Sequence, residues 1–131
     1  MFTHITIGTN NLPQATDFYN HVLATIGIQL AVVKRNPARA IYKRADSNAR
    51  TSFCVYSPFN GEAASGGNGT MVSFEAQDRA QVDQFYETAM RCGGSDEGVP
   101  GLRTRYSPNF YGAYIRDLDG NKICCVCYRE M

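Results

Sequence analysis

The sequence predicts an α+β fold of two tandem βαβββ modules related by a pseudo-twofold axis. Residues 4–27 align without a gap with residues 71–94. Both segments start as a short apolar strand and continue into an amphipathic helix closed by glycine, and a strand-rich stretch follows each of them. The alignment places His4 opposite Met71. One supersecondary unit used twice leaves a crevice between its two copies, and that crevice is a natural ligand site.

The first module starts with a strand at residues 2–9. Alternation in this strand puts Phe2, His4 and Thr6 on one face and the apolar isoleucines on the other. A helix follows, with Asn11 as a candidate N-cap. Its predicted buried stripe is Ala15, Phe18, Tyr19, Val22, Leu23 and Ile26, and Gly27 closes it. Strands are predicted at 28–34, 38–44 and 51–56, with breaks at 36–37 and 46–48.

The second module repeats this design. Asp78 is the predicted N-cap of its helix, and Gln81 is the capping-box partner. The predicted stripe is Val82, Phe85, Tyr86, Ala89 and Met90, and the glycine pair at 93–94 closes the helix. A weak strand is expected within 95–106, and further strands are expected at 111–116 and 122–128. The last two strands are joined by residues 118–121, which carry a strong hairpin signal.

The chain is expected to form one domain over residues 1–131. Module one covers about 1–57 and module two about 70–131. The two modules are expected to share one domain because neither alone is large enough to bury a good core. The linker at 58–69 is rich in glycine, alanine, serine and asparagine, which is the composition of a flexible connector.

Composition narrows the function classes. The sequence is 44% hydrophobic and 19% charged with a net charge of +1, so it is globular and lacks the basic stripe of a nucleic-acid-binding protein. No apolar run reaches membrane length and no export signal is evident, so a cytoplasmic protein is expected. The five cysteines are an odd number and predict no disulfide framework.

Two βαβββ modules, an early histidine in the first strand and the DLDGN sequence at 117–121 resemble the vicinal oxygen chelate superfamily. This superfamily contains glyoxalase I, extradiol dioxygenases, and fosfomycin-resistance and bleomycin-binding proteins. Residues 110–126 are similar to the small glyoxalase-like members, whose version typically ends in D-P-D-G-N-x-I-E. The resemblance spans nearly the whole chain. It implies a cup-shaped mixed β-sheet with flanking helices, around a divalent metal held by histidines and glutamates of the first and last strands.

The resemblance also implies where those metal ligands would lie. His4 matches the first-strand ligand of module one, whereas Met71 stands where metal-binding relatives have histidine. Cys124 stands where the last-strand glutamate is usual, and Cys54 is at the matching place in module one. The implied metal ligands are therefore His4, Cys54 and Cys124, a set without the oxygen donors that hard cations need.

Three functions remain open. The first is binding of a small organic molecule in the cup, with the usual metal-ligand set largely lost, no cofactor and unknown catalytic residues. The second is a metal-dependent lyase, isomerase or dioxygenase with a non-standard ligand set around His4, aided by Glu62 or Glu75. Soft ligands there would favour Cu(I) or zinc. The third is a non-catalytic interaction protein.

The ligand site is predicted from the residues that face the same way as His4. Arg105, beside the turn at 107–109, could hold an anionic group, and Tyr111 is placed near the rim. The predicted ligand-binding residues are Phe2, His4, Thr6, Met71, Ser73, Arg105, Tyr111, Cys124 and Val126. Eight tyrosines without tryptophan suit a flat organic ligand. A homodimer is expected from the resemblance.

Overall fold

The computed structural model describes residues 1–46, 48 and 50–130. Its elements in chain order are β1 (His4–Gly8), α1 (Leu12–Ala24), β2 (Ile28–Lys34), β3 (Arg39–Arg44), β4 (Ser52–Tyr56), β5 (Met71–Glu75), α2 (Arg79–Arg91), β6 (Ser95–Leu102), β7 (Tyr111–Arg116) and β8 (Lys122–Cys127). The two βαβββ modules are confirmed. Several strand ends are one or two residues shorter than predicted. The predicted break at 46–48 includes Ser47, which lies outside the described residues.

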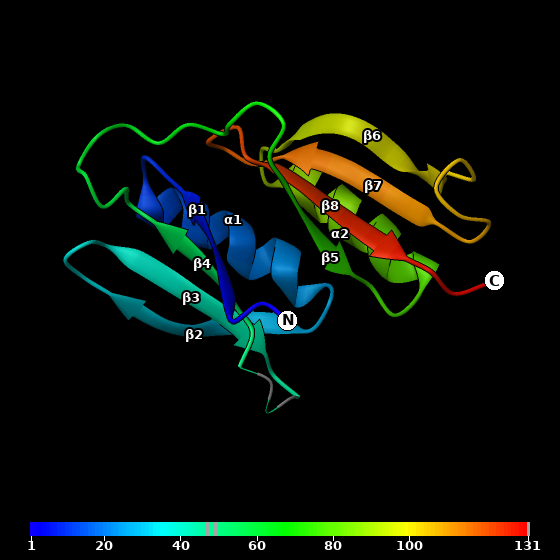
Figure 1. Ribbon diagram of the computed structural model, residues 1–131, viewed down its shortest axis with the longest axis horizontal. Coiled ribbons are helices and arrows are strands. Elements are labelled where there is room, and N and C mark those ends of the chain that lie inside the picture. The colour runs from blue at the N-terminus through cyan, green and yellow to red at the C-terminus, as the bar shows by residue number, and fades with distance from the viewer. Residues whose placement is uncertain (47, 49, 131) are drawn as a thin grey trace.

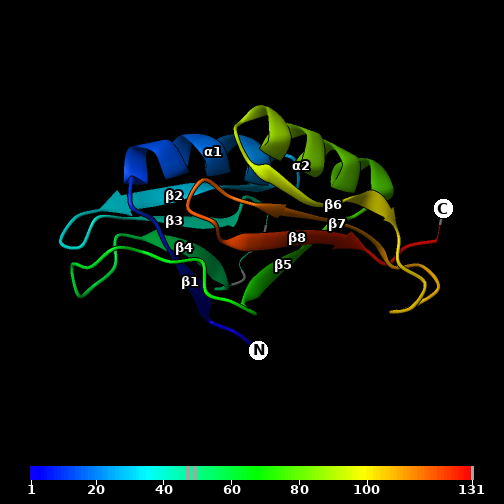
Figure 2. The same ribbon diagram turned by 90° about the horizontal axis from the view of Figure 1, so that it is seen from above.

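Each module folds its strands into one mixed four-stranded sheet. The strand orders are β1-β4-β3-β2 and β5-β8-β7-β6, so the two sheets are equivalent copies. The first strand of each module pairs parallel with the last, which places His4 beside Ser52 and Met71 beside Lys122. The sheets lie side by side, and both helices lie on one side of them (Figures 1 and 2). Each sheet therefore has a face that packs against the helices and a second face that we call its open face.

One hydrophobic core runs across both modules. The ring of Tyr19 lies 5.2 Å from that of Phe53, which lies 5.1 Å from Phe74 of the second module. Phe74 in turn lies 6.2 Å from Phe85 on α2. Aromatic pairs at these centroid separations stabilise the fold by more than the burial of their apolar area alone would. The modules therefore share packing energy, as expected for units too small to fold well alone.

Both helices start as the sequence predicts. The Asn11 side chain accepts a hydrogen bond from the Gln14 backbone, and Asp78 accepts one from the Gln81 backbone. The Gln81 side chain reaches back to the backbone N–H of Gln77, one residue before the N-cap. No helix among the described residues is long and apolar enough to cross a membrane.

The turn between β7 and β8 fastens the second module to the first. The buried Asp117 carboxylate accepts a hydrogen bond from the Tyr19 hydroxyl of α1 at 2.5 Å and another from the Asn121 side chain at 2.9 Å. The same Asn121 amide donates to the Gly8 carbonyl of β1, and Asp119 accepts from the backbone N–H of Asn10. We call these contacts the hairpin clasp. They show that the DLDGN sequence joins the modules as well as forming a turn.

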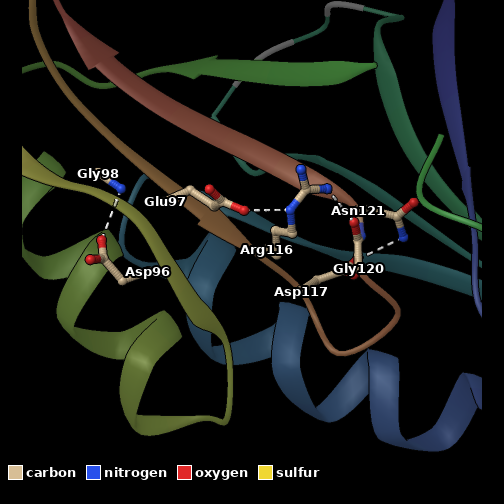
Figure 3. Close-up of polar contacts among 7 residues, drawn as sticks. All are labelled: Asp96, Glu97, Gly98, Arg116, Asp117, Gly120 and Asn121. Atoms are coloured by element: carbon tan, nitrogen blue, oxygen red, sulfur yellow. Dashed lines mark hydrogen bonds and ion pairs between the residues drawn. The ribbon is translucent and has the colours of Figure 1, made fainter. Parts of the chain in front are cut away.

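The hairpin clasp is also tied to the edge of its own sheet. Arg116 donates to the Glu97 carboxylate of β6 at 2.5 Å and to the Gly120 carbonyl at 2.8 Å (Figure 3). Figure 3 also shows Asp96 accepting a hydrogen bond from the Gly98 backbone, beside an irregularity in the pairing of β6 with β7. The turn is thus held from two directions.

The linker is held against both modules despite its composition. Asn10 and Ala64 exchange two hydrogen bonds, at 2.7 and 3.3 Å. A Cβ atom on Gly66 would lie 2.3 Å from the Gly120 carbonyl oxygen of the hairpin clasp. Glycine is needed at this position because the two backbones touch there.

Candidate functional site

The open face of the first sheet carries the predicted histidine, which lines none of the pockets described for residues 1–46, 48 and 50–130. His4 and Thr6 are exposed, and the Nδ1 atom of His4 lies 2.9 Å from the Thr3 hydroxyl. Cys54, across from Thr6 on β4, is buried with its sulfur 3.8 Å from the Ser52 hydroxyl. The predicted alternation in β1 is therefore confirmed.

Side chains cover more of the open face of the second sheet than of the first. Met71 and Ser73 are exposed on β5, and Cys124 lies between Ser73 and Tyr114 in the strand register. Cys124 and Val126 are buried yet stand apart from the core cluster that contains Cys125 and Cys127. Side chains on the open face therefore cover this part of β8.

The thiols of β8 are buried, and burial raises the pKa of Cys125. Burial raises the pKa of Cys124, although hydrogen bonds with Ser73 and Tyr114 oppose this shift. Cys124 and Cys127 have the C-x-x-C spacing, but on a strand residues three apart point to opposite faces. All five cysteines are free thiols in the structure. A thiol held neutral is a poor nucleophile and a poor metal ligand.

A pocket of about 470 Å³ opens on the second sheet beside the loop between β6 and β7, which lies at the outer end of the molecule (Figure 1). We call it the aromatic pocket, and its walls are Met71, Tyr106, Ser107, Phe110, Tyr114, Lys122 and Tyr128. The Phe110 ring lies 4.9 Å from that of Tyr106 and 5.6 Å from that of Tyr128. Volumes of this order accommodate small organic ligands.

Positive charge surrounds the aromatic pocket. The Arg103 guanidinium and the Lys122 ammonium each lie 5.6 Å from the Tyr114 ring centre, and Arg105 lies 4.9 Å from the ring centre of Tyr106. These are cation–π distances. Burial, with smaller effects from Cys124 and other neighbours, raises the pKa of Tyr114 to about 12. Among the described residues, none that lines the pocket is acidic.

Glycines make room for these side chains. A Cβ atom on Gly112 would lie 2.9 Å from the Phe110 ring, and one on Gly98 would lie 3.0 Å from the Tyr114 ring. A Cβ atom on Gly101 would lie 3.0 Å from the Arg103 guanidinium. The glycines of β6 and β7 thus let the loop side chains lie flat against the sheet.

A second cavity of about 400 Å³ lies between the modules. We call it the seam cavity. It is lined by Phe2, Ile5, Ile28, Tyr42, Arg44, Thr51, Ser52, Phe53, Val72, Ser73, Phe74 and Glu75. Arg44 donates a hydrogen bond to the Ile26 carbonyl, and Tyr42 donates to the Asn20 side chain. This cavity lies between the two copies of the repeat, but its lining includes Ile5, Val72 and Phe74, which alternate with the predicted residues His4, Met71 and Ser73.

The structure distributes the predicted site residues over several places. Phe2 and Ser73 line the seam cavity, Met71 lines the aromatic pocket, and Arg105 stacks on one of its walls. His4 and Thr6 are on the first open face, and Cys124 and Val126 are buried beneath the second.

Tyr111 lies away from the open face, although the sequence placed it near the rim. Its hydroxyl donates to Asp83 of α2 at 2.6 Å, and Arg79 of α2 lies over its ring. The hydrogen bond to Asp83, followed by burial, raises the pKa of Tyr111 to about 12. The reason is register, because Tyr111 starts β7 on the parity that faces the helix.

Of the predicted ligand-binding residues only Met71 is a wall of the aromatic pocket, and the walls that were missed include Phe110, Tyr114, Lys122 and Tyr128. Lys122 and Tyr128 alternate with Cys124 and Val126, so strand parity alone predicts their face. Tyr114 follows from its register with Cys124. Predicting Phe110 as a wall would have required the path of the loop between β6 and β7, which strand parity does not give.

The implied metal-ligand positions fit a divalent cation poorly. Over residues 1–46, 48 and 50–130, no group of three or more His, Cys, Asp or Glu side chains is arranged to hold a metal ion. His4 and Met71 are exposed on different sheets, and Cys54 and Cys124 are buried thiols. The positions contribute no carboxylate, and the two cysteines would have to lose their thiol protons before they could bind a metal such as zinc.

Comparisons with known proteins agree with this architecture. A sequence profile described as the Glyoxalase/Bleomycin resistance protein/Dioxygenase superfamily matches residues 1–125. The chain is similar to the crystal structure of a glyoxalase/bleomycin resistance protein from Albidiferax ferrireducens, with 37% identity and a TM-score of 0.87 over 98% of this chain and 99% of that one. No curated protein matches the sequence.

More distant solved structures share the fold. A glyoxylase/bleomycin resistance protein/dioxygenase domain from Frankia has 14% identity and a TM-score of 0.75, with 98% of both chains covered. The fosfomycin resistance protein FosX from Listeria monocytogenes, complexed with Mn(II) and dihydroxypropylphosphonic acid, has 14% identity and a TM-score of 0.69 over 96% of this chain and 88% of that one.

Proposed function

We propose that this chain, which belongs to the Glyoxalase/Bleomycin resistance protein/Dioxygenase superfamily, binds a small organic molecule without a divalent metal. The single observation that carries the proposal is the aromatic pocket of about 470 Å³, with ring walls that are half-buried or exposed. Exposed aromatic surface in a concave site gains free energy when a ligand covers it.

The donor chemistry supports the metal-free part of the proposal. FosX carries Mn(II), a metal for which carboxylate and imidazole are suitable ligands. In this chain the positions that the family resemblance implies for metal ligands offer one imidazole, one thioether and two buried thiols. This argument rests on ligand type, so it holds also if two copies of the chain complete the site together.

The proposal predicts thermal stabilisation by organic ligands in the presence of a chelator. Purified protein is heated with a panel of small aromatic and aliphatic acids, amines and neutral compounds, each with and without EDTA. A ligand that binds only the folded state raises the Tm in a concentration-dependent manner. We expect stabilising compounds whose effect is unchanged by EDTA.

Two results would overturn the proposal. One is a panel in which no compound raises the Tm at millimolar concentration. The other is stabilisation that appears only after manganese, nickel, zinc or iron is added, and that is lost in His4→Ala. The second result would establish a metal site built around His4.

A further inference from the structure

We propose that the aromatic pocket selects flat aromatic anions, such as aromatic carboxylates, through Arg105 and Lys122. This inference rests on the proposed function and adds the ligand class. It starts from the two properties that the pocket combines, ring surfaces for a planar group and cations without a carboxylate partner among the described residues. The seam cavity also has aromatic rings and a cation, Arg44, but Arg44 donates to the Ile26 carbonyl and the acidic Glu75 lines the same cavity, which disfavours an anion there.

The ring walls define the shape of the ligand. Phe110 contacts Tyr106 in a tilted arrangement and Tyr128 edge-to-face, so the loop and the end of β8 present ring faces and edges around one space. Tyr106 and Tyr128 are each more than half exposed, which leaves their ring surface free for a ligand. A planar conjugated ligand gains the most from such walls, since stacked and edge-to-face contacts need flat partners.

The cations define the charge of the ligand. Arg116–Glu97 is the one ion pair among the described residues, so neither Arg105 nor Lys122 has a carboxylate partner there. Arg105 is exposed and Lys122 half-buried, and both lie at ring faces of the pocket walls. A carboxylate that reaches either group would form a charge-assisted hydrogen bond at little desolvation cost.

Arg103 has a different role from Arg105 and Lys122. Its guanidinium donates to the Val99 carbonyl at 2.7 Å and lies over Tyr114, close to Gly98 and Gly101. Its hydrogen-bonding capacity is therefore partly used within the loop. We assign it as a positioning residue that fixes Tyr114. Arg105 makes one long hydrogen bond, to the Tyr106 hydroxyl at 3.4 Å, so among the described residues its other donors and those of Lys122 remain for a ligand.

The test compares two probes of the same shape, 2-naphthoate and its uncharged analogue 2-naphthamide, by calorimetric and fluorescence titration. With two unpaired cations and modest gains from each, we expect about tenfold tighter binding of the naphthoate. Arg105→Gln with Lys122→Gln should bring the two affinities within about twofold. The matched control Lys34→Gln with Arg35→Gln removes the same charge from the exposed end of β2, and should leave the ratio unchanged.

Site variants separate failure of this inference from failure of the proposed function. Tyr106→Leu should weaken naphthoate binding, whereas Phe2→Ala in the seam cavity should not. Equal affinities for the two probes, or binding lost in Phe2→Ala alone, would overturn the aromatic-anion site while leaving a small-molecule protein. If neither probe binds and the wider panel fails as well, both the inference and the proposed function fall.

Discussion

At the scale of single residues, the contact of Tyr19 with Asp117 joins the modules most directly. The hydroxyl and the carboxylate are both buried and lie 2.5 Å apart, although 98 positions separate them in the sequence. Removing one partner of a buried charged hydrogen bond costs about 1.5–3 kcal/mol. The predicted hairpin signal contained Asp119 and Gly120 but gave no sign of this bond, because its partner lies in the other module.

Tyr19→Phe is expected to lower the free energy of unfolding by about 1.5–3 kcal/mol at neutral pH. The variant keeps the ring packing against Phe53 and loses only the hydroxyl. Urea denaturation followed by circular dichroism measures the change. Tyr128→Phe, at an exposed position, serves as the control and should stay within about 0.5 kcal/mol.

The same variant should alter the pH dependence of stability. Burial, and then the negative charge of Asp117, raises the pKa of Tyr19 well above its ordinary value. Because the folded pKa exceeds the unfolded one, this contribution is complete below about pH 10 and is lost as the pH rises further. The difference in unfolding free energy between wild type and Tyr19→Phe should shrink above about pH 10. A difference that stays constant up to the alkaline limit of folding would contradict this account.

At the scale of elements, the linker and the hairpin clasp act together. The linker composition predicts flexibility, yet Asn10 holds Ala64, and Gly66 touches the Gly120 carbonyl. Composition reports what a segment can do when free, and it does not reveal backbone contacts with residues more than 50 positions away. Strand alternation, helix stripes and N-caps were predictable for the opposite reason, since each depends on neighbours within a few residues.

Gly66→Ala should destabilise the protein by about 1–3 kcal/mol, the usual cost of forcing an atom into a packed contact. A methyl group there would overlap the Gly120 carbonyl, so either the linker or the β7–β8 turn must move. The adjacent Ser65→Ala, at an exposed position, is the matched control. If Gly66→Ala and wild type unfold at the same urea concentration, the linker backbone does not pack against the β7–β8 turn as described.

At the scale of the whole molecule, the repeat predicted the fold. It did not predict that the two open faces differ, with a pocket-forming loop on the second sheet. His4 and Met71 are equivalent by sequence, and the structure places them in equivalent strands. The loop between β6 and β7 then covers only the second sheet, and it creates an aromatic pocket with no counterpart in the first module among the described pockets. A repeat reports what the two halves share, so a feature of one half escapes it.

Self-association remains a prediction at this scale. Val32 is exposed on the first sheet, Met71 is exposed on the second, and Phe2 is exposed at the seam cavity. Exposed apolar side chains of this kind favour pairing of two copies. We expect a dimer in sedimentation velocity at micromolar concentration, and His4→Glu with Phe2→Asp should shift it toward monomer. A wild-type protein that sediments as a monomer at 100 µM, a concentration of the order used for ligand titration, would contradict the expectation.

The metal content of the protein tests the central claim most directly. The protein is purified under reducing conditions without chelator or affinity metal and analysed by plasma mass spectrometry. Our account predicts far less than one metal ion per chain, with no gain in Tm when manganese, nickel, zinc or iron is added. Near-stoichiometric metal that is lost in His4→Ala would contradict it, and would make this chain a metal-dependent member of its superfamily.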